Sequence, residues 1–243
     1  MFLSARVKAA TVLMVLSVSL IPCYTFAQDN LYAKLTELAR QGNVDAQYHV
    51  GMLLNNGIGV SKDFKQAYEW FEKSSRNGDA LAAYKVGCYL AGQFGNVVPL
   101  DAAMAFNYKL RSAEAGYSLA QQDIAVSYLR KSEFEKAVQW SKAAADQGYP
   151  MALYNLSVFY KDGKGVPADK TLSYGYFKLA KLVAEGKINP NAQTALEDLK
   201  KSMSENEIER AEQFVAQWKA ELTPLTLRAQ EGLKSAQRLV DEM

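Results

Sequence analysis

The stretch from Ala46 to Gly78 reads AQYHVGMLLNNGIGVSKDFKQAYEWFEKSSRNG. Its first part has apolar residues at helical spacing and ends in the glycine-rich turn GIGV, residues 57–60. Its second part has the same spacing and ends at Gly78. Such a helix–turn–helix unit has an apolar face that one helix pair cannot bury. We therefore expect copies of the unit to stack along the chain.

The unit recurs three more times. The alanine that opens each first helix gives the period, with spacings of 36, 38 and 32 residues between Ala46, Ala82, Ala120 and Ala152. The third copy lacks the Gly-x-Gly turn and passes directly through Lys131-Ser132-Glu133. The pattern predicts an all-α solenoid with four repeats, over residues 46–81, 82–119, 120–151 and 152–187.

Particular residue types carry the expected packing. Placed on a helical wheel, Ala46, Val50, Leu53 and Leu54 share one face and form the predicted core. Gly51 lets the paired helix approach closely, and Trp70 and Trp140 act as large wedges on second helices. Glycines are expected to end helices and to form turns, because a left-handed backbone strains least without a Cβ. These structural glycines are Gly57, Gly59, Gly78, Gly116, Gly148, Gly163 and Gly165.

Atypical helices are expected at both ends of the stack. Residues 28–45 predict an N-terminal capping helix that stops at Gly42. Residues 188–243 predict C-terminal capping helices, with a break near Ser204 and a last amphipathic segment after Pro224. We expect the apolar faces of these helices to point towards the fourth repeat. An apolar stripe in the last segment also allows it to bind a partner.

The first 27 residues have the features of a secretory signal peptide. Arg6 and Lys8 precede a short apolar run, and small residues precede a cleavage site after Ala27. The run has about 14 residues, fewer than the roughly 20 that a membrane span needs. A membrane anchor and a lipid attached at Cys23 are the alternatives. We expect a periplasmic or secreted protein without a membrane span after cleavage.

Charge and cysteine content narrow the possible partners. The chain has 28 Lys and Arg residues against 26 Asp and Glu, and removal of the signal peptide leaves a chain that is close to neutral. Nucleic-acid binding is not expected, because it needs a concentrated positive face. Only Cys88 remains after cleavage, so the mature chain cannot form an internal disulfide.

The order of these residues resembles the Sel1-like repeat family, whose members are relatives of the tetratricopeptide repeats. The resemblance rests on Ala46, Val50, Gly51, the GIGV turn, Asp63, Ala67, Trp70 and Gly78. It implies a right-handed α/α superhelix that works as an adaptor or binding scaffold, often in bacterial envelopes. One cysteine-rich branch is linked to penicillin binding. This chain lacks the cysteine pairs of that branch, so the activity does not carry over.

No catalytic, cofactor or metal site is indicated by the sequence. His49 is the only histidine, and we place it on the exposed side of its helix, where it has no second histidine or cysteine pair to share a metal. Cys88 is interpreted as a small residue on a repeat surface or seam, with a reactive thiol as the alternative. Carboxylates are scattered at surface spacing and do not converge.

One face of the first helices is a candidate binding groove. Tyrosines and other residues at equivalent positions would form a partly apolar ladder, which is typical of protein-binding surfaces. The candidate residues are Tyr48, Met52, Asn55, Tyr84, Cys88, Gln122, Val126, Tyr154 and Val158. The alternative is that the tyrosines belong to the packing of the repeats.

The leading hypothesis is therefore a non-catalytic scaffold that binds a segment of another envelope or secreted protein in its concave groove. A second hypothesis is a protein that binds or hydrolyses cell-wall material or a β-lactam. A third is a regulator of a membrane sensor kinase, a flagellar component or a secretion component, which would use the first mechanism on another partner. The sequence does not choose an oligomeric state.

Overall fold

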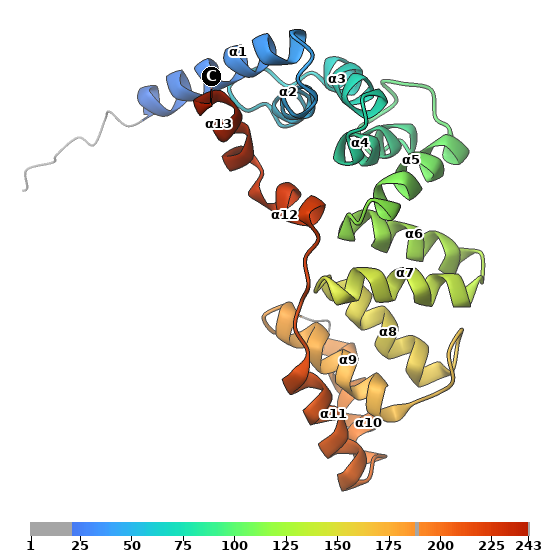
Figure 1. The fold of residues 1–243 in the computed structure, drawn as a ribbon. Coiled ribbons are helices and arrows are strands. Elements are labelled where there is room, and N and C mark those ends of the chain that lie inside the picture. The colour runs from blue at the N-terminus through green and yellow to red at the C-terminus, as the bar shows by residue number, and fades with distance from the viewer. Residues whose placement is uncertain (1–20, 188–189, 243) are drawn as a thin grey trace, which may run out of the picture.

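The computed structural model describes residues 21–187 and 190–242, and Figure 1 shows their arrangement. Most of the predicted signal peptide lies outside the described residues. Within these residues there are thirteen helices and no strand. The helices are α1 (Ile21–Arg40), α2 (Val44–Asn56), α3 (Phe64–Arg76), α4 (Ala80–Leu90), α5 (Ala102–Glu114), α6 (Ser118–Arg130), α7 (Phe134–Asp146), α8 (Pro150–Asp162), α9 (Lys170–Val183), α10 (Pro190–Lys201), α11 (Glu205–Gln217), α12 (Pro224–Glu231) and α13 (Leu233–Asp241).

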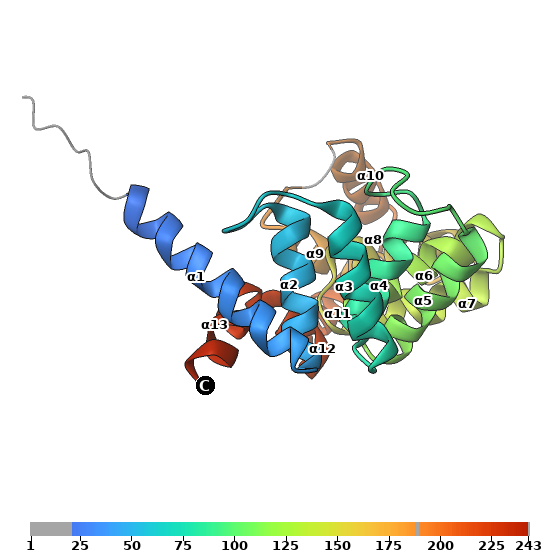
Figure 2. The ribbon, with the colours of Figure 1, turned by 90° about the horizontal axis from the view of Figure 1, so that it is seen from above.

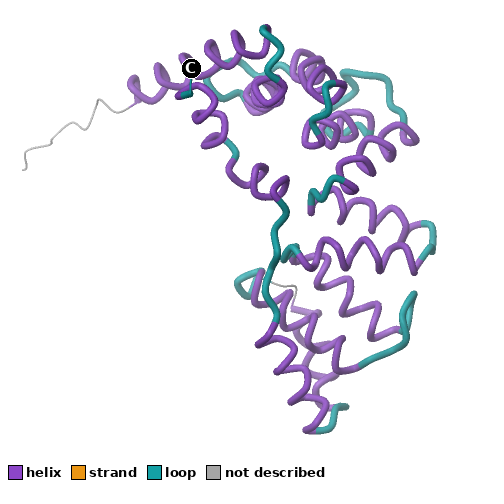
Figure 3. The backbone as a smooth tube through the Cα atoms, in the orientation of Figure 1, coloured by secondary structure: helices purple, strands orange, loops and turns teal. Residues whose placement is uncertain are grey.

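Helices α1 to α9 pack in chain order and form an arc, as the solenoid prediction requires. The first helices of the repeats are α2, α4, α6 and α8, and the second helices are α3, α5, α7 and α9. The turns that precede α5, α7 and α9 lie along the outer rim of the arc (Figure 3). This rim shows long turns before α5 and α9 and a short turn before α7.

The predicted core is confirmed. Ala46, Val50, Leu53 and Leu54 of α2 are all at most 1% exposed. A Cβ on Gly51 would lie 2.7 Å from the Phe71 ring, so the glycine does allow α3 to approach closely. Bulky residues of one repeat meet those of the next, which is how stacked units bury a shared core. The tryptophans Trp70 and Trp140 are half-buried against this core.

Each first helix begins two residues before the alanine used to define the repeat. In α2 and α4 the reason is a side-chain cap: Asn43 accepts from the Ala46 amide and Asp79 from the Ala82 amide, both at 2.8 Å. Such a cap satisfies an amide that has no partner within the helix. The predicted boundaries at residues 46, 82, 120 and 152 therefore lie inside helices α2, α4, α6 and α8.

The predicted structural glycines occupy strained positions. Gly57 and Gly163 end α2 and α8 in the left-handed conformation, with φ of 71° and 65°. The other turn and helix-end glycines of the predicted set also have positive φ, namely Gly59, Gly78, Gly116, Gly148 and Gly165. An L side chain at these positions would be strained.

The C-terminal helices divide into two groups. The predicted break near Ser204 is present, and Ser204 and Glu207 form a capping box at the start of α11. Helices α10 and α11 cover α9 of the last repeat. The aromatic rings of Phe214 and Tyr176 lie 5.0 Å apart in this contact.

Helices α12 and α13 do not cover the last repeat, so the expectation for the last segment is wrong. They cross the open side of the arc and pack on α4, α2 and α1 at its other end (Figure 1). The view from above shows α13 beside α1 and α12 beneath the first repeats (Figure 2). Ala236 and Val240 are buried in the same cluster as Leu31 and Leu35. The last segment therefore closes the N-terminal end of the solenoid.

Candidate protein-interaction site

The predicted groove is mostly filled by the protein itself. Five of its side chains are 7% exposed or less, namely Tyr48, Asn55, Tyr84, Cys88 and Gln122. Four others are half-buried, namely Met52, Val126, Tyr154 and Val158. The expectation of an exposed ladder is therefore wrong for the first five residues.

The buried members make specific internal contacts. The Tyr84 hydroxyl donates to Asp123 Oδ2 at 3.2 Å, and its ring meets Tyr117 edge-on at 5.2 Å. Asn55 Oδ1 accepts from the Tyr89 hydroxyl at 2.8 Å. These contacts join neighbouring helices, so the face that we assigned to a partner is used to pack the repeats together.

Cys88 lies on a buried seam, 2% exposed, in agreement with the packing interpretation. Burial raises the pKa of its thiol, and the nearby Lys109 only partly opposes that effect. Because the thiolate is the reactive form of cysteine, this position is poorly suited to nucleophilic chemistry.

The best-defined binding surface is the row of turns that join each second helix to the next first helix. We call it the docking edge, residues 43–49, 77–79, 116–121 and 146–149. The segment that occupies it is the tail, residues 218–242. The tail leaves α11 as an extended connection and then forms α12 and α13 along the inner side of the arc (Figure 3).

The start of the tail, residues 221–226, is held by hydrogen bonds to two turns, the one between α5 and α6 and the one between α7 and α8. The Glu221 amide donates to the Asp146 carbonyl at 2.8 Å. The Thr223 hydroxyl donates to the Gly116 carbonyl at 2.9 Å, and the Thr226 hydroxyl donates to Gln147 Oε1 at 2.6 Å. These contacts satisfy polar groups of the turns that would otherwise face water.

Gln147 organises this part of the edge. Its amide nitrogen donates to the Gly116 carbonyl at 2.8 Å and to Gln121 Oε1 at 2.9 Å, which leaves its oxygen for the tail. Gly116 also admits the tail sterically, because a Cβ there would lie 3.0 Å from Thr223. A buried network with all its members paired specifies one arrangement of the chain.

Arg228 is the principal anchor of the tail. Its guanidinium pairs with Asp45 in the first turn of α2 at 3.0 Å and with Asp79, the residue that caps α4. It also lies over the Tyr48 ring, 5.4 Å from the centroid. The Asp79 side chain is 1% exposed, and a buried carboxylate needs such a partner.

His49 lies beneath α13 and is 4% exposed, so its predicted place on an exposed surface is wrong. Ser235 Oγ lies 3.1 Å from His49 Nε2 and 2.9 Å from the Gly232 carbonyl, so the serine hydroxyl links the histidine ring to the start of α13. The pair fixes α13 in place.

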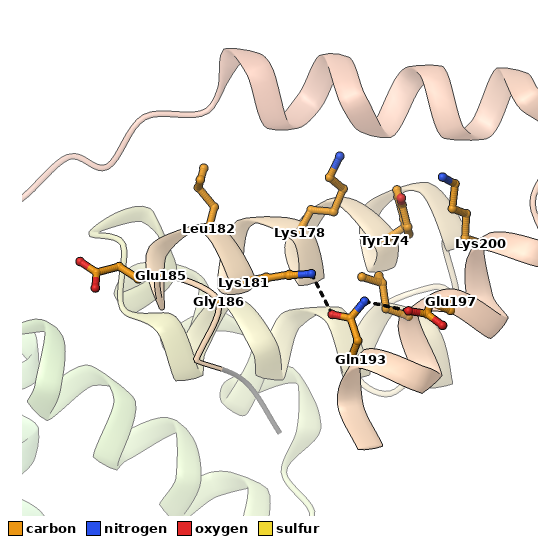
Figure 4. Close-up of a pocket in the computed structure, with 10 residues that line it drawn as sticks. Tyr174, Lys178, Lys181, Leu182, Glu185, Gly186, Gln193, Glu197 and Lys200 are labelled. Carbon is orange, nitrogen blue, oxygen red and sulfur yellow. Dashed lines mark hydrogen bonds between the residues drawn. The ribbon is translucent and has the colours of Figure 1, made fainter. Parts of the chain in front are cut away.

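A hollow lies between α9 and α10 (Figure 4). Its volume is about 570 Å³, and Tyr174 and Leu196 are among the residues that line it. Lys181 Nζ donates to Gln193 Oε1 at 3.0 Å, and the Gln193 amide donates to Glu197 at 3.1 Å. Because these polar groups are paired with one another, they join the two helices and do not converge on a ligand.

In residues 21–187 and 190–242, no group of three or more His, Cys, Asp or Glu side chains is placed to hold a metal ion. No helix in the same part of the chain is long and apolar enough to cross a membrane.

The residues of the docking edge were missed by the sequence reasoning. Asp79 could be recognised as a helix cap, and Thr223-Pro224 as a helix start. Nothing in the spacing shows that Arg228 reaches Asp79, because the two residues are far apart in the chain and meet only through the curvature of the solenoid.

Substitution of Arg228 by Ala is expected to release the tail and to lower the free energy of unfolding by about 2 kcal/mol, because it leaves Asp79 without its charged partner. Hydrogen exchange would show faster exchange in residues 224–241. The matched control is Lys234→Ala, which removes an exposed charge from the same segment. Equal exchange in the two variants would contradict the assignment of Arg228 as the anchor.

His49 makes stability depend on pH. Burial, with a contribution from Arg228, lowers its pKa from 6.5 to about 4, although Asp45 opposes the shift. Between pH 4 and pH 6.5 the unfolded chain binds a proton on this histidine that the folded chain excludes. The free energy of unfolding is therefore highest above pH 6.5 and falls as the pH falls towards 4. The free energy of unfolding falls by about 3 kcal/mol in total over this range. Urea titrations of wild type and His49→Gln at several pH values measure it, and the variant should lack this part of the slope.

Comparison with known proteins agrees with the architecture. The sequence model of the Sel1 repeat matches residues 44–79, 80–117, 122–149 and 150–182, more than half of the chain. The crystal structure of a Sel1 repeat protein from Oxalobacter formigenes is similar in fold, with a TM-score of 0.62 and 24% sequence identity. That similarity covers 81% of this chain and 82% of the other.

Two curated relatives are similar over part of the chain. The sel1-like repeat-containing protein L21 of Acanthamoeba polyphaga mimivirus is 29% identical over 143 residues, which are 58% of this chain and 26% of that protein. The chitin synthase regulator SKT5 of Saccharomyces cerevisiae is 29% identical over 145 residues, 54% of this chain and 20% of that protein. The chain thus spans about a quarter or less of the length of these relatives. Four matched repeats on four stacked helix pairs show that the chain belongs to the Sel1 repeat family.

Proposed function

We propose that this protein is a non-catalytic scaffold of the periplasm or the extracellular space that binds a segment of another envelope or secreted protein. Sel1 repeat proteins are generally protein-interaction scaffolds. The observation that carries the proposal is the docking edge, which already binds one polypeptide segment, the tail. The partner segment would bind this edge in place of the tail.

The chemistry of the edge defines the segment it would accept. Gly116 and Asp146 offer backbone carbonyls, and Gln147 offers a side-chain oxygen, to amides and hydroxyls of a partner. Asp45 and Asp79 offer two carboxylates to one guanidinium. The expected segment therefore has hydroxyl residues followed by an arginine. Because the edge is pre-formed, the scaffold loses little conformational entropy on binding.

The location rests on the N-terminal sequence. A short apolar run after two basic residues, followed by the cleavage signal at Ala27, supports export. Cleavage would start the mature chain at Gln28 and would retain residues 28–40 of α1, including Leu31 and Leu35, which contact α13 through the first core cluster.

In-cell photocrosslinking tests the proposal. A tagged chain carrying a photoreactive residue at the exposed position 227 of the tail would report displacement, and one at the exposed position 77 of the edge would report the partner. We expect an exported protein to crosslink at position 77 more strongly in the Arg228→Ala background, because the edge is then free.

The control is Gln147→Ala combined with Arg228→Ala, which also removes the side-chain acceptor of the edge and should weaken the crosslink. A partner that is captured equally in all backgrounds would place binding elsewhere. Capture of nothing but the chain itself, or of cell-wall fragments, would contradict the scaffold function. Intact mass of the periplasmic or secreted chain tests the cleavage after Ala27 in the same preparation.

A further inference from the structure

The outer rim of the solenoid has a gap at the third repeat. In the second repeat, the turn before α5 places Phe94 against Phe64, the first residue of α3, with ring centroids 5.8 Å apart. In the fourth repeat, the turn before α9 lies on the start of α7: a Cβ on Gly165 would be 2.5 Å from the Phe134 backbone. Each of these turns covers the start of the preceding second helix.

The third repeat has no such turn. Its connection from α6 to α7 is only residues 131–133, and it does not cover the start of α5. The position that holds Phe64 in α3 and Phe134 in α7 is Ala102 in α5, so the side chain there is also small. A pocket of about 840 Å³ results, between the first half of α5 and the end of α6.

The walls of this pocket are largely apolar and exposed. Leu100, Ala103 and Phe106 line it. Leu100 is 59% exposed. Large apolar side chains that gather beside a hollow are typical of surfaces that bind another protein.

The charge of the pocket is of one sign. Its lining includes Lys109, Arg130 and Lys131 and no acidic residue. Lys109 pairs with Asp123 at 2.6 Å, and Lys131 lies 4.9 Å from the Phe106 centroid. Arg130 has no ion-pair partner among the described residues and is exposed at the rim.

The acidic residues that flank the pocket in the sequence have other partners, and Glu133 pairs with Lys136 at 2.6 Å. Asp101 precedes α5 and is used to cap it, since its carboxylate accepts from the Met104 amide at 2.8 Å. Arg130 and Lys131 are therefore available to carboxylates of a partner, at a site where an apolar side chain can be buried.

We propose that this rim pocket is a docking site for an extended segment of a partner protein that carries a large aromatic residue between acidic residues. The aromatic side chain takes the place that Phe94 takes in the complete turn, and the flanking carboxylates pair with Arg130 and Lys131. The proposal goes beyond the docking edge, because the pocket lies on the opposite rim and shares no residue with it.

Fluorescence anisotropy with labelled hexapeptides tests this proposal on the full mature chain. The probe is Asp-Glu-Phe-Gly-Glu-Asp, and the control probes are Asp-Glu-Ala-Gly-Glu-Asp and Lys-Lys-Phe-Gly-Lys-Lys. We expect the first probe to bind and the alanine probe to bind about tenfold more weakly, because the buried aromatic is the anchor. The basic probe should show no binding.

Two variants alter the pocket in different ways. Arg130→Glu with Lys131→Glu reverses its charge, and insertion of Gly-Ile-Gly-Val between Lys131 and Ser132 restores the missing turn. Each variant is expected to bind the acidic aromatic probe about tenfold more weakly than wild type, or weaker still. Lys161→Glu with Lys164→Glu is the matched control, because it reverses two charges on the same rim in the fourth repeat and should leave binding unchanged.

Circular dichroism and melting curves establish that both variants fold. Binding that survives charge reversal and turn insertion in folded protein would overturn the proposal, and so would equal binding of the aromatic and alanine probes or no binding of any probe. The Arg228→Ala variant opens the docking edge only, so it should bind the probe as wild type does. These measurements therefore test the rim pocket separately from the docking edge.

Discussion

The ion pairs of Arg228 with Asp45 and Asp79 are the interaction on which the closed form of this solenoid depends. They join a residue near the C-terminus to the first helices of two successive repeats. Because stacked repeats contact only their neighbours, the ends of such a stack are ordinarily independent. Here the tail makes the first and last repeats parts of one structure, and it covers a face of α1 and α2 that would otherwise meet water.

The two ends of the stack have different caps. Helix α11 covers α9 in the usual manner of a terminal helix, with Phe214 packed where Gly175 lacks a side chain. At the other end, Ala236 and Val240 of α13 complete the core around Leu31 and Leu35. The docking edge lies between these two caps. Its polar groups, Gln147 above all, hold the start of the tail by hydrogen bonds.

Much of the fold could be predicted from the sequence, because it depends on local signals. The spacing of Ala46, Val50 and Leu53 defines a helix face, and glycines such as Gly57 end helices in a conformation that other residues avoid. The destination of the last segment could not be predicted. An amphipathic pattern shows that a face is buried, but it does not show which surface buries it.

The candidate site was predicted less well, for a related reason. Helical spacing places Tyr48 and Tyr84 away from the core of their own repeat, yet the adjacent repeat and the tail cover that face. The short connection at residues 131–133 was visible in the sequence. Its consequence, the open pocket at the start of α5, depends on where the turns of the other repeats lie in space.

A distance measurement tests whether the tail returns to the first repeat. Spin labels on cysteines introduced at the exposed positions 37 of α1 and 237 of α13 would be measured by double electron–electron resonance, with the buried Cys88 left in place. We expect one narrow distribution of distances, centred at the short separation of two helices in contact. A broad distribution centred at long distance would show that the tail does not return to the first repeat and that the solenoid is not closed by it.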